Sequence, residues 1–204
     1  MAARTLLLGH PSVVAPALLG SRLTTCVDGA VVTIRITEVE AYGGVGEDPG
    51  SHAFRRQTAR NATMFGPAGH LYVYFTYGMH WCANVVTGEE GTAGAVLVRA
   101  GEVVAGIDFA RVRRPGSSIR DLARGPARLA RAMGLTGEQD GIDLLRRDSA
   151  VILELGTPVD VGRIATSART GVAGAGAPTP WRFYLRDEPS VSPFRPAKAR
   201  SAKM

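Results

Sequence analysis

Cysteine, histidine and long apolar runs are scarce in this 204-residue sequence. The two cysteines, Cys26 and Cys82, have no CxxC spacing and are too few for a disulfide framework, which favours a reducing, cytoplasmic environment. No segment approaches the roughly 20 apolar residues needed to span a bilayer, and His10, Pro11 and Pro16 interrupt the N-terminal apolar run. Four scattered histidines add no ligand spacing, so we expect no metal site. These absences leave a soluble protein of one compact domain.

Acidic residues are outnumbered by basic residues, and the basic residues are unevenly distributed along the chain. The chain has 24 Lys and Arg against 18 Asp and Glu, a net charge of +6. Residues 1–110 carry 7 basic and 9 acidic side chains, whereas residues 111–204 carry 17 and 9, so the excess lies in the second half. Clustered basic groups attract a polyanion, although charge alone does not identify a nucleic acid.

Hydrophobic periodicity predicts several strands and few helices. One helix is expected from Ser12 to Leu23, and a second begins at Pro126 and is capped by Gly134. A long loop rich in glycine and proline covers residues 43–69, and loops of that length are usually functional or disordered. The runs typical of strands lie at residues 30–42, 70–77, 82–86, 94–103 and 181–186.

Alternation along residues 30–42 assigns side chains to two faces. Ile34, Ile36, Glu38 and Glu40 would point one way, with the intervening residues pointing the other way. One face of this predicted strand therefore ends in two carboxylates.

Aromatic residues make up only 6% of the chain, yet they crowd into "HLYVYFTYGMHWCANVV", residues 70–86. In a strand, Tyr72, Tyr74 and Thr76 would share one face, while the other would carry Val73, Phe75 and Tyr77. Such rings can simply pack a core with their hydroxyls at its edge. They can equally form a platform on which nucleobases stack.

Polar neighbours favour the second interpretation. Glu40 lies two residues before Tyr42 in "TEVEAY", while His52 comes from the long loop and Asn84 from "CANVV". Each alone has an ordinary explanation, as a surface charge, a loop residue or a strand-end amide. Together they suit a pocket that binds a heteroaromatic base and activates water beside it.

The run from Arg35 to Val86, together with "GAVLVRA", "RGPARLARAM" and "WRFYLR", resembles the alkyladenine (3-methyladenine) DNA glycosylase family. The resemblance reaches from the opening helix to about Ser192. It implies an α+β fold, with a curved, mostly antiparallel sheet and surrounding helices in one domain, residues 1–194. A basic disordered tail would follow at 195–204. The implied activity is excision of damaged purines from duplex DNA without a cofactor. An enzyme that scans DNA works well as a monomer, and we expect it to be cytoplasmic, or nucleoid-associated in a bacterium.

The resemblance also implies roles for single residues. Glu40 would be the general base that activates water, and Arg99 would hold this carboxylate and the water. Tyr42 and Tyr74 would sandwich the extruded base, His52 would complete the wall, and Asn84 would form the floor. The residues implied or expected to face DNA are Thr58, Arg60, Met64, Tyr77, Met79, His80, Arg128 and Arg169, with Tyr77 as the wedge that fills the gap in the duplex.

Lysine is nearly absent, which bears on the reaction type. Only Lys198 and Lys203 occur, both in the expected tail, so an amine nucleophile forming a Schiff base is not expected. This predicts a monofunctional enzyme that leaves an intact abasic site. Expected lesions are 3-methyladenine, 7-methylguanine, hypoxanthine and ethenoadenine. Two alternatives stay open: a non-catalytic nucleic-acid-binding module, and a hydrolase of free nucleosides.

Overall fold

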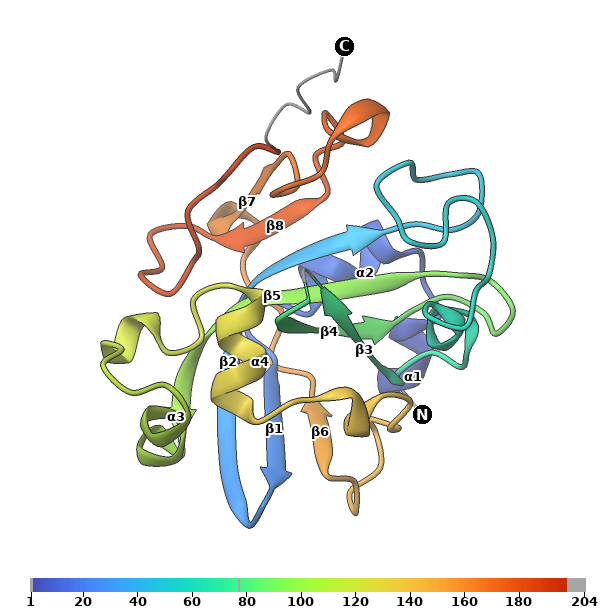
Figure 1. Cartoon of the computed structure of the whole chain (residues 1–204). Helices are drawn as coiled ribbons and strands as arrows, with labels where there is room; N and C mark the ends of the chain where they lie inside the picture. Colours follow the sequence, from blue (N-terminus) through green and yellow to red (C-terminus); the bar gives the residue numbers. More distant parts are fainter. Residues whose placement is uncertain (1, 77, 198–204) are drawn as a thin grey trace.

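An antiparallel sheet organises the computed structural model, which describes residues 2–76 and 78–197 (Figure 1). Within these residues the sheet has eight strands, ordered β3-β4-β5-β2-β1-β6, while β8 pairs with β2 and with β7. The predicted α+β class is confirmed. The strands are β1 (Arg22–Val27), β2 (Ala30–Tyr42), β3 (Leu71–Thr76), β4 (His80–Val86), β5 (Ala95–Ala105), β6 (Val151–Glu154), β7 (Ile164–Ser167) and β8 (Arg182–Leu185). The helices are α1 (Ala2–Leu7), α2 (Pro11–Ala17), α3 (Ile107–Arg113) and α4 (Pro126–Met133).

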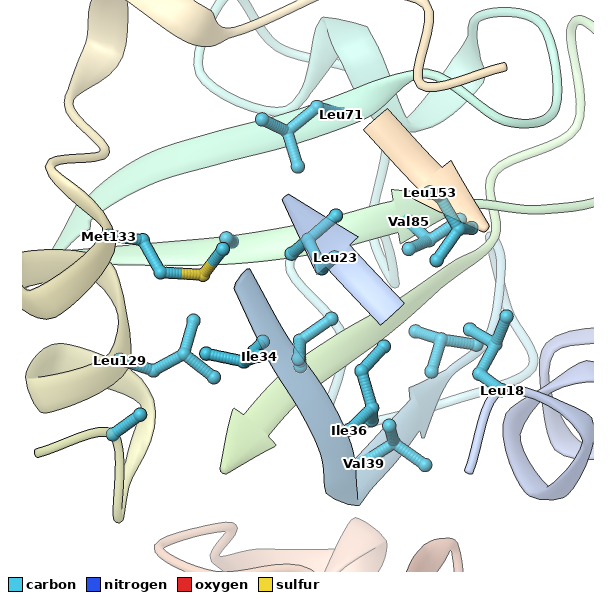
Figure 2. Close-up of a cluster of buried hydrophobic side chains, with 14 of the residues drawn as sticks. Leu18, Leu23, Ile34, Ile36, Val39, Leu71, Val85, Leu129, Met133 and Leu153 are labelled. Atoms are coloured by element: carbon cyan, nitrogen blue, oxygen red, sulfur yellow. The ribbon is translucent and has the colours of Figure 1, made fainter. Parts of the chain in front are cut away.

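The main hydrophobic core joins the sheet to α2 and α4. Leu129 and Met133 of α4 and Leu18, just after α2, belong to the same buried cluster as the strand residues Ile34 and Val85 (Figure 2). All five are fully buried. Burying such side chains contributes roughly 1.5–3 kcal/mol each, so this core fixes the strands that carry the polar residues described below.

Helix α4 begins and ends as the sequence predicts. Pro126 is its first residue, where a missing N–H costs no hydrogen bond. Gly134 follows the last turn with φ 73°, a left-handed conformation that favours glycine. The remaining turns place Leu129 and Met133 against the core and leave Arg128 and Arg131 exposed.

The predicted N-terminal helix is wrong beyond Ala17. Helix α2 stops there, the chain turns through Gly20 at φ 81°, and β1 starts at Arg22. Leu23 therefore lies in the sheet, paired with Ile34. The expected helix includes the first two residues of β1, and the sequence pattern does not predict the rest of β1 or the elements α1, α3, β6 and β7.

A β-bulge in β2 overturns the predicted alternation along this strand. Opposite β5, Ile36 pairs with Gly101 and Glu38 with Ala100, which leaves Thr37 as an extra residue. Ile34 and Ile36 belong to the core, but beyond the bulge Val39 does so instead of Glu38. The bulge turns Glu38 and Glu40 away from the apolar side. Beyond it, β2 also gains β8 as a neighbour along residues 38–40.

The predicted boundary between the domain and a C-terminal tail stays a prediction. Residues 198–204 lie outside the described residues, so the disordered tail stays a prediction. The carbonyl oxygen of Arg195, the first residue of that tail, accepts a hydrogen bond of 3.0 Å from the N–H of Gly171. In the described part of the chain, no helix has the length and apolar character that crossing a membrane requires.

Candidate active site

The carboxylate of Glu40 is completely buried and accepts three hydrogen bonds. The hydroxyl of Tyr42 donates to Oε2 at 2.8 Å, and Nη1 of Arg99 donates to the same oxygen at 3.2 Å. The backbone N–H of Thr170 donates to Oε1 at 2.6 Å. Charge-assisted donors of this kind stabilise an ionised carboxylate inside a protein. The structure thus brings together Glu40, Tyr42 and Arg99, as the family resemblance implies.

A second buried carboxylate, Glu38, holds Arg99 in place. Its Oε1 accepts from Nε of Arg99 at 2.8 Å and from Nε of Arg182 at 2.7 Å, while the N–H of Ser192 donates to Oε2 at 2.7 Å. Burial alone would raise the pKa of Glu38, but the charges of Arg99 and Arg182 outweigh it and lower that pKa. Arg99 therefore bridges the two glutamates.

Sequence reasoning did not assign Glu38 or Arg182 to the site. Glu38 stands two residues before Glu40 in "TEVEAY", and Arg182 lies in "WRFYLR". A second acid and a second arginine in the quoted motifs were the available signals. The pairing itself, across 144 residues, could not be found without the fold.

A pocket of about 310 Å³ lies beside this cluster. That volume is at the lower end of the range of roughly 300–1,000 Å³ typical of small-molecule sites. Glu40 is not part of the pocket wall, but its three donors Tyr42, Arg99 and Thr170 are. The predicted base-binding residues that line the pocket are Tyr42, His52, Tyr74 and Asn84, accompanied by Met64, Tyr72, Thr76 and Cys82.

The rings of the pocket are arranged by strand alternation and by neighbouring arginines. Tyr72, Tyr74 and Thr76 all line it, which confirms the predicted face of β3. The ring of His52 meets that of Tyr74 edge-on, with centroids 4.6 Å apart. The guanidinium of Arg60 lies 5.7 Å from the centre of the Tyr74 ring. Edge-on rings and a cation above a ring face are both favourable, so Tyr74 is well fixed.

These rings are neutral near pH 7. Burial raises the pKa of Tyr74, and burial together with the charge of Glu40 raises the pKa of Tyr42 well above its usual value. Burial and then the charge of Arg60 lower the pKa of His52. The pocket thus offers uncharged aromatic faces beside one buried anion.

Asn84 has a fixed orientation on β4. It is 3% exposed, and its Nδ2 donates to the carbonyl oxygen of Tyr72 at 3.0 Å. This bond uses one of the two amide hydrogens and, together with burial, holds the side chain in one orientation. A rigid amide can exclude a base whose edge does not match it.

The long loop supplies residues of two kinds. Thr58 and Arg60 are exposed, and Nη2 of Arg60 donates to the carbonyl oxygen of Phe75 at 2.9 Å. Met64 is only 2% exposed and packs with Tyr72 and Val86. Met64 therefore lines the pocket and not the exposed surface of the loop, and its contact with DNA stays a prediction.

Arg169 is wrongly expected to contact a phosphate. Its side chain is completely buried, and its two terminal nitrogens form a bidentate ion pair with Asp48 at 2.5 and 2.6 Å. Its guanidinium stacks 4.7 Å from the centre of the Tyr42 ring and 5.4 Å from that of Trp181. Arg169 thus supports one wall of the pocket from behind.

The turn between β3 and β4 was predicted to hold the wedge. Tyr77 lies outside the described residues, and its role stays a prediction. Gly78 has φ 66°, which suits a tight turn, and the next two side chains, Met79 and His80, are exposed, Met79 by 67%. Arg128 is exposed on α4, where a phosphate can reach it. Across residues 2–76 and 78–197, no group of three His, Cys, Asp or Glu side chains is arranged to hold a metal ion.

Comparison with known proteins gives one consistent result. Residues 6–189 match the family described as methylpurine-DNA glycosylase (MPG). A protein of Streptomyces avermitilis is 50% identical over 184 residues, covering 89% of this chain and 86% of that protein. One of Leifsonia xyli subsp. xyli is 53% identical over 189 residues (89% and 87%), and one of Burkholderia lata is 49% identical over 183 residues (88% and 84%). All three are named "Putative 3-methyladenine DNA glycosylase".

Proposed function

The chain belongs to the methylpurine-DNA glycosylase family and is a DNA glycosylase, a hydrolase of N-glycosidic bonds, and we propose that it excises alkylated and deaminated purines from damaged duplex DNA. Its substrates are 3-methyladenine, 7-methylguanine, hypoxanthine and ethenoadenine. It acts as a monomer without a cofactor and leaves an intact abasic site.

One observation carries this proposal: Tyr42 joins the buried acid to the pocket. Its ring lines the pocket, while its hydroxyl donates to Glu40 at 2.8 Å. A purine held against this ring has its glycosidic bond near the carboxylate. A base cannot occupy such a pocket inside the stack, so the nucleotide must first be turned out of the duplex, at a cost of a few kcal/mol.

The hydrolysis follows from the free acceptor positions of Glu40. Among the described residues, Oε1 accepts one hydrogen bond, from Thr170, which leaves it a lone pair for a water molecule. Because Glu40 has no exposed surface in the unbound protein, this water reaches it only when the extruded nucleotide displaces part of the pocket wall. The oxygen of that water attacks C1′ of the deoxyribose while Glu40 takes its proton. The bond from C1′ to the purine nitrogen breaks, and its electron pair leaves with the base. The negative carboxylate also stabilises the positive charge that develops on the sugar.

The neutral aromatic walls suit charged lesions. Methylation at N3 or N7 makes a purine cationic, and the face of a tyrosine attracts a cation by roughly 0.5–2 kcal/mol. A cationic base also leaves without being protonated. His52, whose pKa is lowered, is neutral near pH 7 and does not supply a proton, so hypoxanthine and ethenoadenine leave more slowly.

The test measures base release from duplexes that carry one defined lesion. The parent enzyme should release 7-methylguanine and hypoxanthine, and Glu40→Gln should reduce the single-turnover rate by about 10²–10⁴-fold, the usual contribution of a general base. An equal rate in the variant would remove Glu40 from the mechanism.

Two further assays separate this function from its alternatives. Release of hypoxanthine from free deoxyinosine as fast as from DNA would indicate a nucleoside hydrolase, and no release from either would indicate a binding module. A covalent adduct trapped by borohydride on damaged DNA would contradict the monofunctional reaction.

A further inference from the structure

A second hollow, larger than the base pocket, opens beside the turn between β3 and β4. Its volume is about 690 Å³ against about 310 Å³ for the base pocket. We call it the arginine groove, after four of its lining residues: Arg113, Arg114, Arg128 and Arg131. Met79, His80 and Trp81 form the wall on the hairpin side, and Asp28 is the one acidic residue in its lining. None of these residues contributes to the base pocket.

The two hollows lie on either side of the tip of the β3–β4 hairpin, where Thr76 lines the base pocket and its strand partner His80 lines the arginine groove. Tyr74 pairs with Cys82 across the strands, and both line the base pocket. The next pair, Phe75 and Trp81, points to the other face, where the two rings lie 4.8 Å apart and Trp81 lines the arginine groove. Helix α4 lies beside the hairpin in Figure 1 and contributes Pro126 to the base pocket and Arg128 to the groove. The tip of the hairpin thus separates the hollows.

The arginines of the groove differ in how they are held. Arg113 is anchored through Nη2, which donates to the carbonyl oxygen of Val27 at 2.9 Å, and Arg114 donates to the hydroxyl of Ser117 at 2.7 Å. Arg128 and Arg131 are exposed and have no hydrogen-bonded or ion-paired partner among the described residues.

Mutual repulsion shows that these charges are close. Burial, followed by the charges of Arg128 and Arg131, lowers the pKa of Arg114, while Asp121 opposes this shift. Like charges that share a hollow are unfavourable by themselves, and an anion placed between them relieves the repulsion.

We propose that the arginine groove binds the phosphate backbone of the DNA strand opposite the lesion. This inference rests on the proposed function and on the wedge that the family resemblance implies at the turn between β3 and β4, which would enter the duplex where the damaged nucleotide has left. The damaged strand sends its nucleotide into the pocket on one side of the hairpin tip. The intact strand passes along the other side, where Arg128 and Arg131 meet its phosphates and Trp81 and Met79 contact the sugars. Residues three apart on a helix are neighbours, so these two arginines act on adjacent phosphates.

The experiment uses the full chain carrying Glu40→Gln, so that bound DNA stays intact. Binding to a lesion duplex is measured over a range of salt concentrations, with and without Arg128→Gln and Arg131→Gln. Each lost phosphate contact reduces the slope of log K against log salt by about 0.9, so the double substitution should reduce it by about 1.8. Arg147→Gln with Arg163→Gln serves as the matched control, because both side chains are exposed and line neither hollow. The control should leave the slope unchanged.

Neutral methylphosphonate linkages then identify the strand. Placed opposite the lesion, they should weaken binding by the protein with an intact groove and have little further effect on the Arg128 and Arg131 variant. A salt slope that the double substitution leaves unchanged would overturn the proposal. So would linkages in the damaged strand that weaken binding by the protein with an intact groove but not by the Arg128 and Arg131 variant. Base release by the parent enzyme is measured separately, so failure of the proposed function is recognised by itself.

Discussion

The buried and the exposed arginines of this protein have different roles. Arg99, Arg169 and Arg182 are at most 6% exposed, and each lies against a carboxylate within 2.8 Å. Arg128 and Arg131 are exposed without such a partner. A buried guanidinium that is ion-paired with a carboxylate holds the residues around the base pocket in place. An exposed guanidinium without a carboxylate partner is available to bind a phosphate. Charge counted along the sequence does not distinguish these two groups.

The largest effect should come from breaking a matched pair. We expect Arg169→Met to reduce the free energy of unfolding by about 3–5 kcal/mol, since it leaves Asp48 buried without its cation. Arg128→Gln should change it by no more than about 0.5 kcal/mol, as is usual for an exposed side chain. Urea unfolding monitored by tryptophan fluorescence measures both. Equal stability of the two variants would contradict the distinction between buried and exposed arginines. Asp48→Asn added to Arg169→Met should recover part of the lost free energy of unfolding.

A smaller effect is expected at Glu38, and it depends on pH. The pKa of Glu38 is lowered from 4.5 in the folded protein, so its stabilising contribution is present above pH 4.5 and is lost as the pH falls through the folded pKa. Glu38→Gln should cost about 2 kcal/mol at pH 7, the size of a hydrogen bond to a charged group. The difference between parent and variant should shrink below pH 4.5. A difference that stays constant from pH 7 to pH 3 would mean that the charge of Glu38 contributes nothing.

The smallest effect should come from Arg60, which belongs neither to the buried, ion-paired arginines nor to the exposed, unpaired ones. It is exposed, but its guanidinium lies over the Tyr74 ring. Arg60→Gln should change the free energy of unfolding by less than about 0.5 kcal/mol. The pKa of His52 should rise towards 6.5 without reaching it, because burial, the larger cause of its lowering, remains. Titration of the His52 ring by NMR measures this, and a pKa that does not move would show that Arg60 exerts no influence there.

Rules about helix ends and strand alternation correctly predicted the elements that depend only on neighbouring residues. Pro126 and Gly134 mark the two ends of α4, and alternation places Tyr72 and Tyr74 on one face of β3. These features depend on backbone conformation within a few residues, which sequence directly encodes. The resemblance to a known family added the roles of Glu40 and Arg99, and the structure does bring those two side chains together.

Features that depend on distant partners were missed. The bulge at Thr37 is recognisable only once β2 is paired with β5, so the alternation of Glu38 with Ile36 was misassigned. Arg169 looked like a free surface cation because Asp48, which neutralises it, is 121 residues away. The arginine groove combines residues from the hairpin and from the α3–α4 region, and no single motif contains it.

The position of Tyr42 has a consequence for accuracy. Its phenol is one rigid body, clamped by Arg169 on the ring and fastened to Glu40 at the hydroxyl. Under the proposed function, a base of the wrong shape that tilts the ring also pulls the Tyr42 hydroxyl away from Glu40, so a poor fit disturbs the carboxylate proposed to activate water. A single side chain would thereby couple the fit of the base to the position of Glu40, without a conformational change elsewhere in the protein.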